Sequence, residues 1–328
     1  MRKVGLTIII PCYNSADMIL NSLKSITSNV SEIYNVEIIV IDDCSGDNTF
    51  EKVEKFSKNN TLDNVDIKIL RNEYNMGAGE SRNVGLEYAN KEYITFLDSD
   101  DVYAKEFFSC VALTLMENND IVVFDAVRDF GKTQQYMDMF YAPAIKGGVV
   151  NVKNALVYMN GSTCGKIYSS NLIKEHRIKF GNTPRMEDLV FSKIAVSFAK
   201  RIYYIRKPLY IYNNKSYSLT NDSSLLCSEN IMRAYDEIKN KINNKNFQSE
   251  LNSIYFLEVL YMAVMNQIRV GKKTKEIKKS YERYIREYDK NDEYIKGYKK
   301  QYKIAYYLFK QGLFDVIKIL IYLKNKGK

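Results

Sequence analysis

Three carboxylates gather directly after a short apolar segment near residue 100. Asp98-Ser99-Asp100-Asp101 follows residues 93–97, whose apolar character is typical of a buried strand. Such charges repel one another unless a cation or hydrogen-bond donors offset them, and Mg²⁺ or Mn²⁺ bound to carboxylates can bridge phosphates. The cluster is therefore a candidate metal site, with a solvated turn as the alternative. A calcium loop is excluded, because Val102 and Tyr103 stand where it needs Asp or Asn and then Gly.

Aromatic and acidic side chains follow two earlier apolar segments in the same way. Pro11-Cys12-Tyr13-Asn14 follows residues 6–10, and Asp42-Asp43-Cys44-Ser45 follows residues 36–41. A tyrosine ring can stack on a planar base, and a carboxylate can accept hydrogen bonds from a base or a ribose. The alternative is a turn in which Ser45 or Asp47 caps a helix that begins near Thr49. We favour capping for Asp47 and ligand binding for the Asp42-Asp43 pair, because one cap does not need two adjacent acids.

A glycine-rich segment follows a third apolar run, residues 65–70. Its sequence is Asn75-Met76-Gly77-Ala78-Gly79-Glu80-Ser81-Arg82-Asn83-Val84-Gly85. Small residues let backbone N–H groups approach a phosphate, and Arg82 adds a forked, positive donor. A dinucleotide-binding turn is disfavoured, since Arg82 stands where its third glycine belongs and the segment does not open the first strand–helix unit. Ligand contact and a purely structural use of the glycines are equal alternatives.

A pair of acids precedes an apolar helical segment further along the chain. Glu187 and Asp188 lie between Arg185-Met186 and Leu189-Val190-Phe191. Acids at a helix N-terminus interact favourably with the helix dipole, and from local sequence alone that structural explanation is the better one. The functional alternative is a carboxylate that accepts a proton from an attacking hydroxyl group.

These clusters need a scaffold that brings the ends of several strands together. In the first hundred residues, short apolar runs alternate with segments of helical spacing, such as Ile19, Leu23 and Ile26. This alternation predicts an α/β fold with a mainly parallel sheet flanked by helices, which residues 121–124 extend. The carboxyl ends of parallel strands share one edge, and ligands bind there. The four clusters that follow predicted strands therefore belong to that edge.

The last third of the chain has a different character. Beyond about residue 228 the apolar residues keep helical spacing, as at Ile254, Leu257 and Val264. We therefore predict two domains, residues 1–225 with the sheet and residues 226–328 as a helical region. Residues 272–328 hold 17 Lys and Arg against 7 Asp and Glu, so the net charge of +9 belongs to this tail. The remainder is near neutral and has no nucleic-acid reader motif, so nucleic-acid binding is not expected.

The cysteines and the apolar segments bear on location. Five widely spread cysteines without metal-ligand spacing favour a reduced, cytoplasmic protein. The apolar stretch near the N-terminus is too short for a signal peptide and is better explained by a first buried strand. No clean run of 18 apolar residues is present, so we expect no membrane-spanning helix.

Taken in order, these clusters resemble the family 2 inverting glycosyltransferases of bacterial surface-polysaccharide synthesis, which have the GT-A fold. The resemblance covers roughly residues 5–225 and rests on five motifs. They are Pro11-Cys12-Tyr13-Asn14, Asp42-Asp43-Cys44-Ser45, Asn75-Met76-Gly77 with Arg82-Asn83-Val84-Gly85, Asp98-Ser99-Asp100-Asp101, and Glu187-Asp188. Cys164-Gly165-Lys166-Ile167-Tyr168 also resembles the lysine-containing segment that these enzymes carry before the acidic pair.

The resemblance implies a role for each residue. Tyr13, Asp43 and Arg82 would contact a uracil-type base with support from Asp42, and Asp98 would reach the ribose. Asp100, with Asp98 and Asp101 nearby, would hold Mn²⁺ or Mg²⁺ on the diphosphate of a UDP-sugar. Asp188 would be the general base, and Glu187 would help to position the acceptor. The other donor-binding residues that it implies are Pro11, Asn14, Asn75, Gly77, Ser99 and Lys166.

By the same resemblance, the protein would move one sugar to a hydroxyl of a glycan or a lipid-linked saccharide. Processive members carry a Gln-x-x-Arg-Trp motif, which a chain without tryptophan cannot contain. Asn213-Asn214-Lys215 stands where the family often has arginine. The motif therefore does not identify the loop that would cover the diphosphate. A non-catalytic partner subunit that binds a sugar nucleotide is the alternative. A nucleotidyltransferase is disfavoured, because no glycine- and Arg/Lys-rich loop follows the first strand.

The tail admits two explanations of equal weight. Residues 304–323 are very apolar but are interrupted by Lys310, Asp315 and Lys318, so they are not expected to cross a bilayer. A basic, tyrosine-rich, amphipathic segment suits an anionic membrane surface, such as the inner face of the plasma membrane. The other explanation is a helical hairpin that packs against the catalytic domain and keeps its charges in water.

Overall fold

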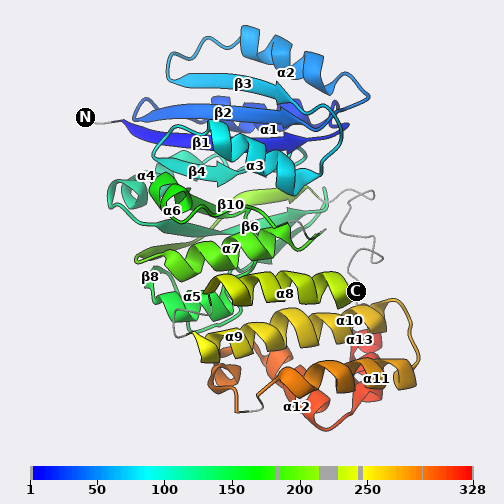
Figure 1. Cartoon of the computed structure of the whole chain (residues 1–328). Helices are drawn as coiled ribbons and strands as arrows, with labels where there is room; N and C mark the ends of the chain where they lie inside the picture. The colour runs from blue at the N-terminus through cyan, green and yellow to red at the C-terminus, as the bar shows by residue number, and fades with distance from the viewer. Residues whose placement is uncertain are drawn as a thin grey trace.

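The computed structural model describes residues 3–181, 183, 185–213, 228–242, 247–289 and 291–326. One large sheet with helices packed on it forms the upper part of the molecule, and a helical region lies below it in the view (Figure 1). This arrangement confirms the predicted α/β class with a helical C-terminal extension. The predicted domain boundary at residue 225 lies outside the described residues.

Four parallel strands form the N-terminal half of the sheet. They are β1 (Val4–Cys12), β2 (Tyr34–Asp42), β3 (Val65–Arg71) and β4 (Tyr93–Phe96), in the spatial order β3-β2-β1-β4. β1 and β2 are buried along nearly their whole lengths, as Val/Ile-rich strands covered on both faces are. Because Cys12 pairs with Asp42 and Ile9 with Phe96, the polar clusters that follow these strands lie at one edge.

The other half of the sheet is mixed. β9 (Lys166–Ser169) runs antiparallel between β4 and β6 (Ile121–Asp129), and β10 (Ile202–Asn213) runs parallel to β6. The shorter strands β5 (Val102–Tyr103), β7 (Gln134–Met137) and β8 (Gly148–Val150) pair antiparallel with β10 or β6. Only residues 121–124 of this half were predicted from the sequence. β9 was not predicted, because a four-residue segment with Lys at one end and Ser at the other shows no clear periodicity of apolar residues.

Helices connect the strands, as the helical spacing predicted. α1 (Ile19–Thr27), α2 (Thr49–Lys58) and α3 (Ala78–Tyr88) follow β1, β2 and β3. α4 (Phe107–Met116), α5 (Val152–Tyr158), α6 (Ser170–Glu175) and α7 (Glu187–Phe198) accompany the second half. α3 lies unusually close to the sheet. A Cβ atom on Gly85 would lie 2.6 Å from Ile9 Cγ2 and 2.9 Å from Ile41 Cδ1.

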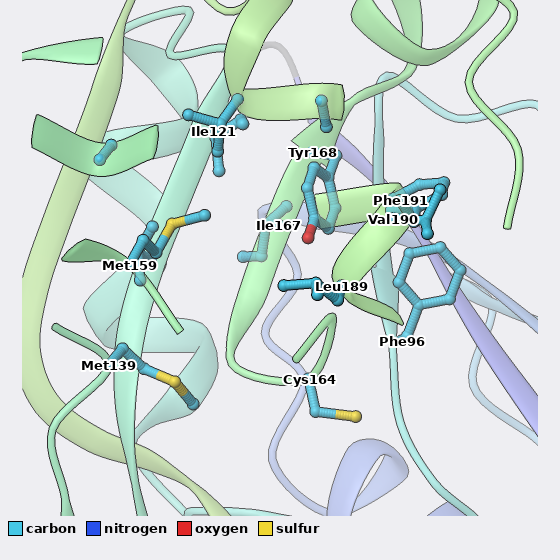
Figure 2. Packing of buried hydrophobic residues seen from close by; sticks show 14 of the residues in the cluster. Phe96, Ile121, Met139, Met159, Cys164, Ile167, Tyr168, Leu189, Val190 and Phe191 are labelled. Atoms are coloured by element: carbon cyan, nitrogen blue, oxygen red, sulfur yellow. The ribbon is translucent and has the colours of Figure 1, made fainter. Parts of the chain in front are cut away.

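An aromatic cluster joins α7 to the sheet (Figure 2). Phe191 of α7 meets Phe96 of β4 edge to face, with ring centroids 5.4 Å apart, and meets Tyr168 of β9 at 5.2 Å. Phe180 stacks on Phe191 at 4.3 Å. Each such pair adds about 0.5–1.5 kcal/mol beyond the burial of its area. The cluster therefore holds the first turn of α7 beside the end of β4.

The helical region packs against α5 and α7. It comprises α8 (Ser228–Ile242), α9 (Gln248–Ile254), the π-helix η4 (Tyr255–Tyr261), α10 (Met262–Arg269), α11 (Thr274–Tyr284), η5 (Ile285–Glu287), η6 (Glu293–Gly297), α12 (Lys300–Lys310) and α13 (Phe314–Lys326). The Tyr158 hydroxyl of α5 donates to the Tyr294 carbonyl at 2.8 Å, and Lys299 pairs with Asp138 at 2.6 Å. Across the described ranges, none of the helices is long and apolar enough to cross a membrane.

The close approach of α3 to the sheet predicts the cost of a single methyl group at residue 85. In Gly85→Ala the added Cβ would overlap two isoleucines that are themselves fully buried. Overpacking of this kind costs about 1–3 kcal/mol, which exceeds the gain of about 0.5–1 kcal/mol from replacing a helical glycine. We expect a lower free energy of unfolding, measured by urea titration. Gly46→Ala is the control, because its nearest atom would lie 3.9 Å away; equal stability of the two variants would contradict the packing.

Candidate active site

Asn14 joins the turns that follow β1 and β2. Asn14 (φ 47°) and Cys44 (φ 62°) have left-handed backbone conformations, which asparagine tolerates better than most residues. The Asn14 N–H donates to Ser45 Oγ at 2.9 Å, and Asn14 Oδ1 accepts from the Gly46 N–H at 2.8 Å. Asn14 therefore has a structural role beside any contact with the donor. Tyr13, half exposed next to it, presents its ring to a planar ligand, while Pro11 is buried within β1.

Asp42 and Asp43 are both buried and are bonded within the protein. Asp42 pairs with Arg71 Nε at 3.2 Å. Asp43 accepts hydrogen bonds of 2.8 Å from the Asn72 side chain and from the Met76 and Gly77 N–H groups. A charged acceptor with three N–H donors holds the backbone that supplies them. Asp43 thus fixes the glycine-rich turn, in which Gly77 has φ +86° and Asn75 is exposed.

Asp47 has the capping function that the sequence favoured for it. Asn48 occupies the N-cap position of α2, and Asp47 Oδ1 accepts from the Thr49 N–H at 3.0 Å. Its other oxygen accepts from the Ala16 N–H at 3.1 Å, so the same carboxylate also ties α2 to the turn after β1.

Arg82 of α3 lies at the centre of the site. Its Nη2 pairs with Asp98 Oδ1 at 2.6 Å, and its Nη1 lies 3.2 Å from Asp188 Oδ1 and 3.9 Å from Glu187 Oε1. The guanidinium is buried, 5.4 Å from the centre of the Phe180 ring. Burial lowers the pKa of Arg82, but the carboxylates of Asp188 and Asp98 raise that pKa by more. Its terminal nitrogens thus join three carboxylates from two distant parts of the chain, and the contact of Arg82 with a base stays a prediction.

The aspartates after β4 have different environments. Asp98 is about one-third exposed, with a side-chain exposure of 35%, and Asp100 is partly exposed. Asp101 is buried, and its carboxylate accepts from the Tyr210 hydroxyl at 2.8 Å and the Asn213 N–H at 2.9 Å. Burial, and then repulsion by Asp98 and Asp100, raises the pKa of Asp101 to about 8. Asp101 therefore anchors the end of β10 and leaves Asp98 and Asp100 as the accessible pair.

Ser99 connects the aspartates to the first turn. Its hydroxyl lies 2.8 Å from the Ser15 hydroxyl, and its carbonyl accepts from the Ser22 hydroxyl at 2.9 Å. The predicted donor-binding residue Ser99 is thus part of the scaffold around the site. The Asn213 side chain donates to the Asp100 carbonyl at 2.6 Å, which closes β10 over the same turn. The neighbouring residues 214 and 215, where the family motif departs, lie outside the described residues.

Asp98 and Asp100 fit a divalent cation that the donor helps to bind. Within the part of the chain that the structure describes, no three His, Cys, Asp or Glu side chains are grouped to hold a metal by themselves. Mg²⁺ in nucleotide sites is commonly bound by one or two carboxylates, with phosphates and waters completing its coordination. The partly exposed carboxylates of Asp98 and Asp100 at the ligand edge meet that requirement, whereas the Asp101 carboxylate is buried against Tyr210 and Asn213.

Glu187 and Asp188 begin α7 and share the Arg82 guanidinium with Asp98, which follows β4. Asp188 Oδ1 faces Arg82, and its Oδ2 accepts from the Thr163 N–H at 3.2 Å. Burial, and then repulsion by Asp188, raises the pKa of Glu187 despite the opposing effect of Arg82. Gly79 makes the approach of α3 to α7 possible, because a Cβ there would lie 2.9 Å from Glu187 Cγ. The pair thus has the helix N-terminal position predicted from the sequence, and it also faces the site.

Lys166 is fully buried on β9, close to the site but not in contact with its open side. Its Nζ donates to the Ser162 carbonyl. Burial, and then the nearby Lys193 charge, lowers the pKa of Lys166 to about 7. The Ser162 hydroxyl in turn lies 3.2 Å from the Tyr212 hydroxyl of β10. Lys166 thus holds the loop whose Thr163 N–H binds Asp188, and a direct donor contact would require its ammonium group to move.

Several residues of the site and of the segments that carry it have unsatisfied polar atoms. In the described ranges, buried side-chain atoms without a hydrogen-bond partner include Arg82 Nε, Thr163 Oγ1, Glu187 Oε2 and Arg185 Nη2. Such atoms are rare in native proteins, and each is normally explained by a bound ligand, a water molecule or a functional role. Thr163 and Tyr210 were not expected at the site, because a backbone donor and an ordinary strand residue carry no local signal of function.

A separate cavity of about 760 Å³ lies at the opposite edge of the sheet. Val4, Tyr93, Asp120 and His176 are among its lining residues, and they come from the starts of strands and the end of α6. The cavity shares no residue with the cluster around Arg82. Ligand binding at the carboxyl ends of the parallel strands is the better expectation, since the side chains predicted to be catalytic converge there.

A protein-family model described as "Glycosyl transferase family 2" matches residues 7–176, more than half of the chain. The putative glycosyltransferase EpsH of Bacillus subtilis is 28% identical over 218 residues, or 65% of this chain and 61% of EpsH. The poly(ribitol-phosphate) beta-N-acetylglucosaminyltransferase TarS of Staphylococcus aureus is 30% identical over 211 residues, or 64% of this chain and 35% of TarS.

A shorter match is to WfgD of Escherichia coli, a UDP-Glc:alpha-D-GlcNAc-diphosphoundecaprenol beta-1,3-glucosyltransferase. It is 38% identical over 113 residues, or 34% of this chain and 42% of WfgD. The chain therefore spans between about one-third and three-fifths of the length of these relatives.

The structure is similar to that of S. aureus TarS 1–349 crystallised with UDP-GlcNAc. The TM-score is 0.67 at 21% identity, and the match covers 99% of this chain and 93% of that one. At this identity the similarity establishes the fold, and it confirms the GT-A fold together with its C-terminal helices.

The raised pKa of Glu187 predicts a pH-dependent gain from removing its charge. A carboxyl group whose pKa is raised in the folded state binds its proton more tightly there. The charged group therefore lowers the free energy of unfolding above the raised pKa, and this loss disappears below the ordinary pKa of a carboxyl group. We expect Glu187→Gln to raise the melting temperature at pH 8. This advantage should shrink as the pH falls toward 4. A gain that grows toward acid pH would contradict the buried, repelled carboxylate.

Proposed function

Because the chain belongs to glycosyl transferase family 2, we propose that it transfers one sugar from a UDP-sugar to a saccharide hydroxyl with inversion. It is a glycosyltransferase by family. The single observation that supports this mechanism most directly is the ion-pair network of Arg82, which sets Asp188 opposite Asp98. A UDP-sugar bound between Asp98 and Asp100, which follow β4, and the start of α7 would have its anomeric carbon facing Asp188.

UDP is the donor nucleotide that we propose. TarS 1–349 has been crystallised with UDP-GlcNAc, and WfgD is named as a UDP-glucose enzyme. In this chain, the half-exposed Tyr13 would stack on the uracil and Asp98 would accept from a ribose hydroxyl. A divalent ion held by Asp98 and Asp100 would offset the negative charge that develops on the departing diphosphate.

Asp188 is the proposed general base. The acceptor oxygen forms a bond to the anomeric carbon as the bond between that carbon and the phosphate oxygen breaks, and Asp188 takes the hydroxyl proton. Attack from the face opposite the leaving group inverts the anomeric configuration. Arg82 and the Thr163 N–H hold the two oxygens of Asp188, so the carboxylate has a fixed direction before the acceptor arrives.

The acceptor that we propose is a glycan or a lipid-linked saccharide of the bacterial surface. TarS is named for a poly(ribitol-phosphate) product and WfgD for a diphosphoundecaprenol-linked acceptor. The chain has no tryptophan for a processive Gln-x-x-Arg-Trp motif, so single transfers fit it better than polymerisation.

An anionic membrane surface is the further partner that we propose for the tail. α12 exposes Ile304 and Tyr307, and α13 exposes Ile319 and Leu320, while Phe314 of α13 is buried. A helix that is apolar on both its inner and outer faces is normally covered. The tail carries an excess of ten positive charges in residues 272–328, so a second copy would repel it, whereas anionic lipid would attract it.

The proposed chemistry predicts the effect of removing the base. Asp188→Asn should lower the rate of sugar transfer by about 10²–10⁴-fold, because general-base catalysis contributes that much. The assay measures the UDP released during transfer from UDP-GlcNAc or UDP-glucose to a surface-glycan acceptor. The affinity of Asp188→Asn for UDP should differ little from that of the wild type. Asp66→Asn, at an exposed acid of β3, is the control. A wild-type protein that binds UDP-sugar but never releases UDP would instead be a non-catalytic subunit.

The exposed face of α13 predicts binding to lipid vesicles. Full-length protein should sediment with phosphatidylglycerol-containing vesicles and less with phosphatidylcholine alone. Ile319→Glu should reduce sedimentation, because it places a negative charge on the apolar face. Leu113→Glu is the matched control, since Leu113 is 73% exposed on α4. If Ile319→Glu dissociated a dimer and left sedimentation with vesicles unchanged, the exposed face of α13 would serve self-association instead of membrane binding.

A further inference from the structure

A buried lysine of α7 binds the end of a neighbouring helix. Lys193 has no exposed surface. Its Nζ donates to the Leu156 carbonyl at 2.8 Å and to the Met159 carbonyl at 2.7 Å, in the last turn and at the C-cap of α5. The carbonyls at a helix C-terminus have no partner within the helix, and a positive charge there interacts favourably with the helix dipole. Lys193 therefore fastens the end of α5 to α7.

An ammonium group is a costly choice for this position. Burial lowers the pKa of Lys193 to about 8, although the carboxylate of Glu258 in η4 acts in the opposite direction. A buried charge costs free energy that an apolar side chain of similar volume would not. A lysine in place of a methionine or a leucine is therefore better explained by the two carbonyls that it holds than by its packing.

The segment of residues 156–163 continues along α7 beyond these two carbonyls. Gly161 lies so close to Leu189 that a Cβ atom on Gly161 would be 2.5 Å from Leu189 Cδ1. The Thr163 N–H then donates to Asp188 Oδ2 at 3.2 Å. As the residue numbers of the segment rise from 156 to 163, those of its partners in α7 fall from 193 to 188. The segment and the first two turns of α7 therefore lie against each other over this whole length.

Further hydrogen bonds keep the part of the segment after α5 in one conformation. The Ser162 N–H donates to Asn160 Oδ1 at 2.7 Å, and the Asn160 N–H donates to the Met139 carbonyl at 2.8 Å. Lys166 binds the Ser162 carbonyl. Because the chain between the end of α5 and Thr163 is short and bonded in this way, a shift of the end of α5 would move the Thr163 N–H.

We propose that Lys193 is a positioning residue for the general base: by fixing the end of α5, it sets the place of the Thr163 N–H, which orients Asp188. This inference rests on the proposed function, in which Asp188 removes the acceptor proton. A displacement of about 1 Å, caused far from the reacting atoms, can cost on the order of 10²-fold in rate. Lys193 acts on Asp188 through the backbone, without contact with the donor or the acceptor.

The test compares Lys193→Met with the wild type in the release of UDP from UDP-GlcNAc or UDP-glucose, with Mn²⁺ and with poly(ribitol phosphate) or water as acceptor. We expect kcat to fall by about 10–10²-fold, since misplacing a catalytic group has a cost of that order. The KM for the donor and the affinity for UDP should stay near the wild-type values. Lys174→Met is the matched control, because Lys174 of α6 donates to the carbonyl of Ala89, the C-cap of α3, at 3.1 Å.

A double-mutant cycle separates positioning from a general loss of stability. If Lys193 acts through Asp188, Lys193→Met should lower the residual rate of Asp188→Asn by a much smaller factor than it lowers the wild-type rate, because the group that it positions is already gone. Equal factors in the two backgrounds would overturn the inference. Ile277→Ala, which opens a cavity at a fully buried residue of α11, controls for lost stability and should keep a kcat near that of the wild type.

Two milder variants keep the inference testable if Lys193→Met does not fold. Lys193→Gln retains a donor group, and its kcat should lie between those of Lys193→Met and the wild type. In Gly161→Ala the added Cβ would overlap Leu189 and push the segment away from the first turn of α7. This variant should also lower kcat at an unchanged donor KM. A wild-type kcat in both variants would contradict the positioning role.

Hydrogen exchange distinguishes failure of this inference from failure of the proposed function. The Thr163 amide should exchange at least about tenfold faster in Lys193→Met than in the wild type, because losing a hydrogen bond to a charged group eases local opening by about that factor. Unchanged exchange together with unchanged kcat would remove the role of Lys193 and leave the proposed function standing. Faster exchange in a protein whose wild type releases no UDP from either donor would keep the link between Lys193 and Thr163 and remove the proposed function.

Discussion

The geometry of the site depends on one buried cation. Arg82 reaches from α3 to Asp98 at the end of β4 and to Asp188 and Glu187 at the start of α7, segments about a hundred residues apart in the sequence. Buried charges are costly unless they are paired, and removing one partner leaves the others uncompensated. The three carboxylates can therefore stand together only because Arg82 is there. Arg82 also holds Asp98, the proposed ribose contact, and Asp188, the proposed general base, on facing sides of the site.

The packing around Arg82 makes this network possible. Gly79 and Gly85 remove side chains where α3 meets Glu187 and where it meets β1 and β2. Phe180, under the guanidinium, stacks on Phe191, which in turn packs on Phe96 just before Asp98. A shift of α3 or α7 would disturb the aromatic contacts and the ion pairs together. The sheet edge, the two helices and the charges form one cooperative unit.

Individual residues show how far the sequence could lead. The strands that precede each polar cluster, and therefore the shared edge, were predictable from apolar runs and their spacing. The favoured cap at Asp47 was correct as well, because an Asx turn is a local interaction. Asp43, Ser99 and Lys166 were expected at the donor, yet in the structure Asp43 and Ser99 bond to distant parts of the chain, and Lys166 bonds to the carbonyl of Ser162 in its own loop. Whether they also touch the donor stays a prediction.

The difference between Asp100 and Asp101 has the same origin. Adjacent aspartates look alike in sequence, but Tyr210 and Asn213 of β10 engage the carboxylate of Asp101, whereas at Asp100 the Asn213 side chain binds the backbone carbonyl. Thr163 belongs to this class too, since a backbone N–H leaves no mark in the pattern of residue types.

The sequence by itself determined the α/β class, the edge at which chemistry would occur and the resemblance to a family, because periodicity and short motifs are local properties. Only the tertiary structure decided which acids are accessible and which cation they share. Those outcomes depend on burial and on charges brought together over long sequence distances. Electrostatic energies in a protein interior follow from such distances, and no local pattern of residues contains them.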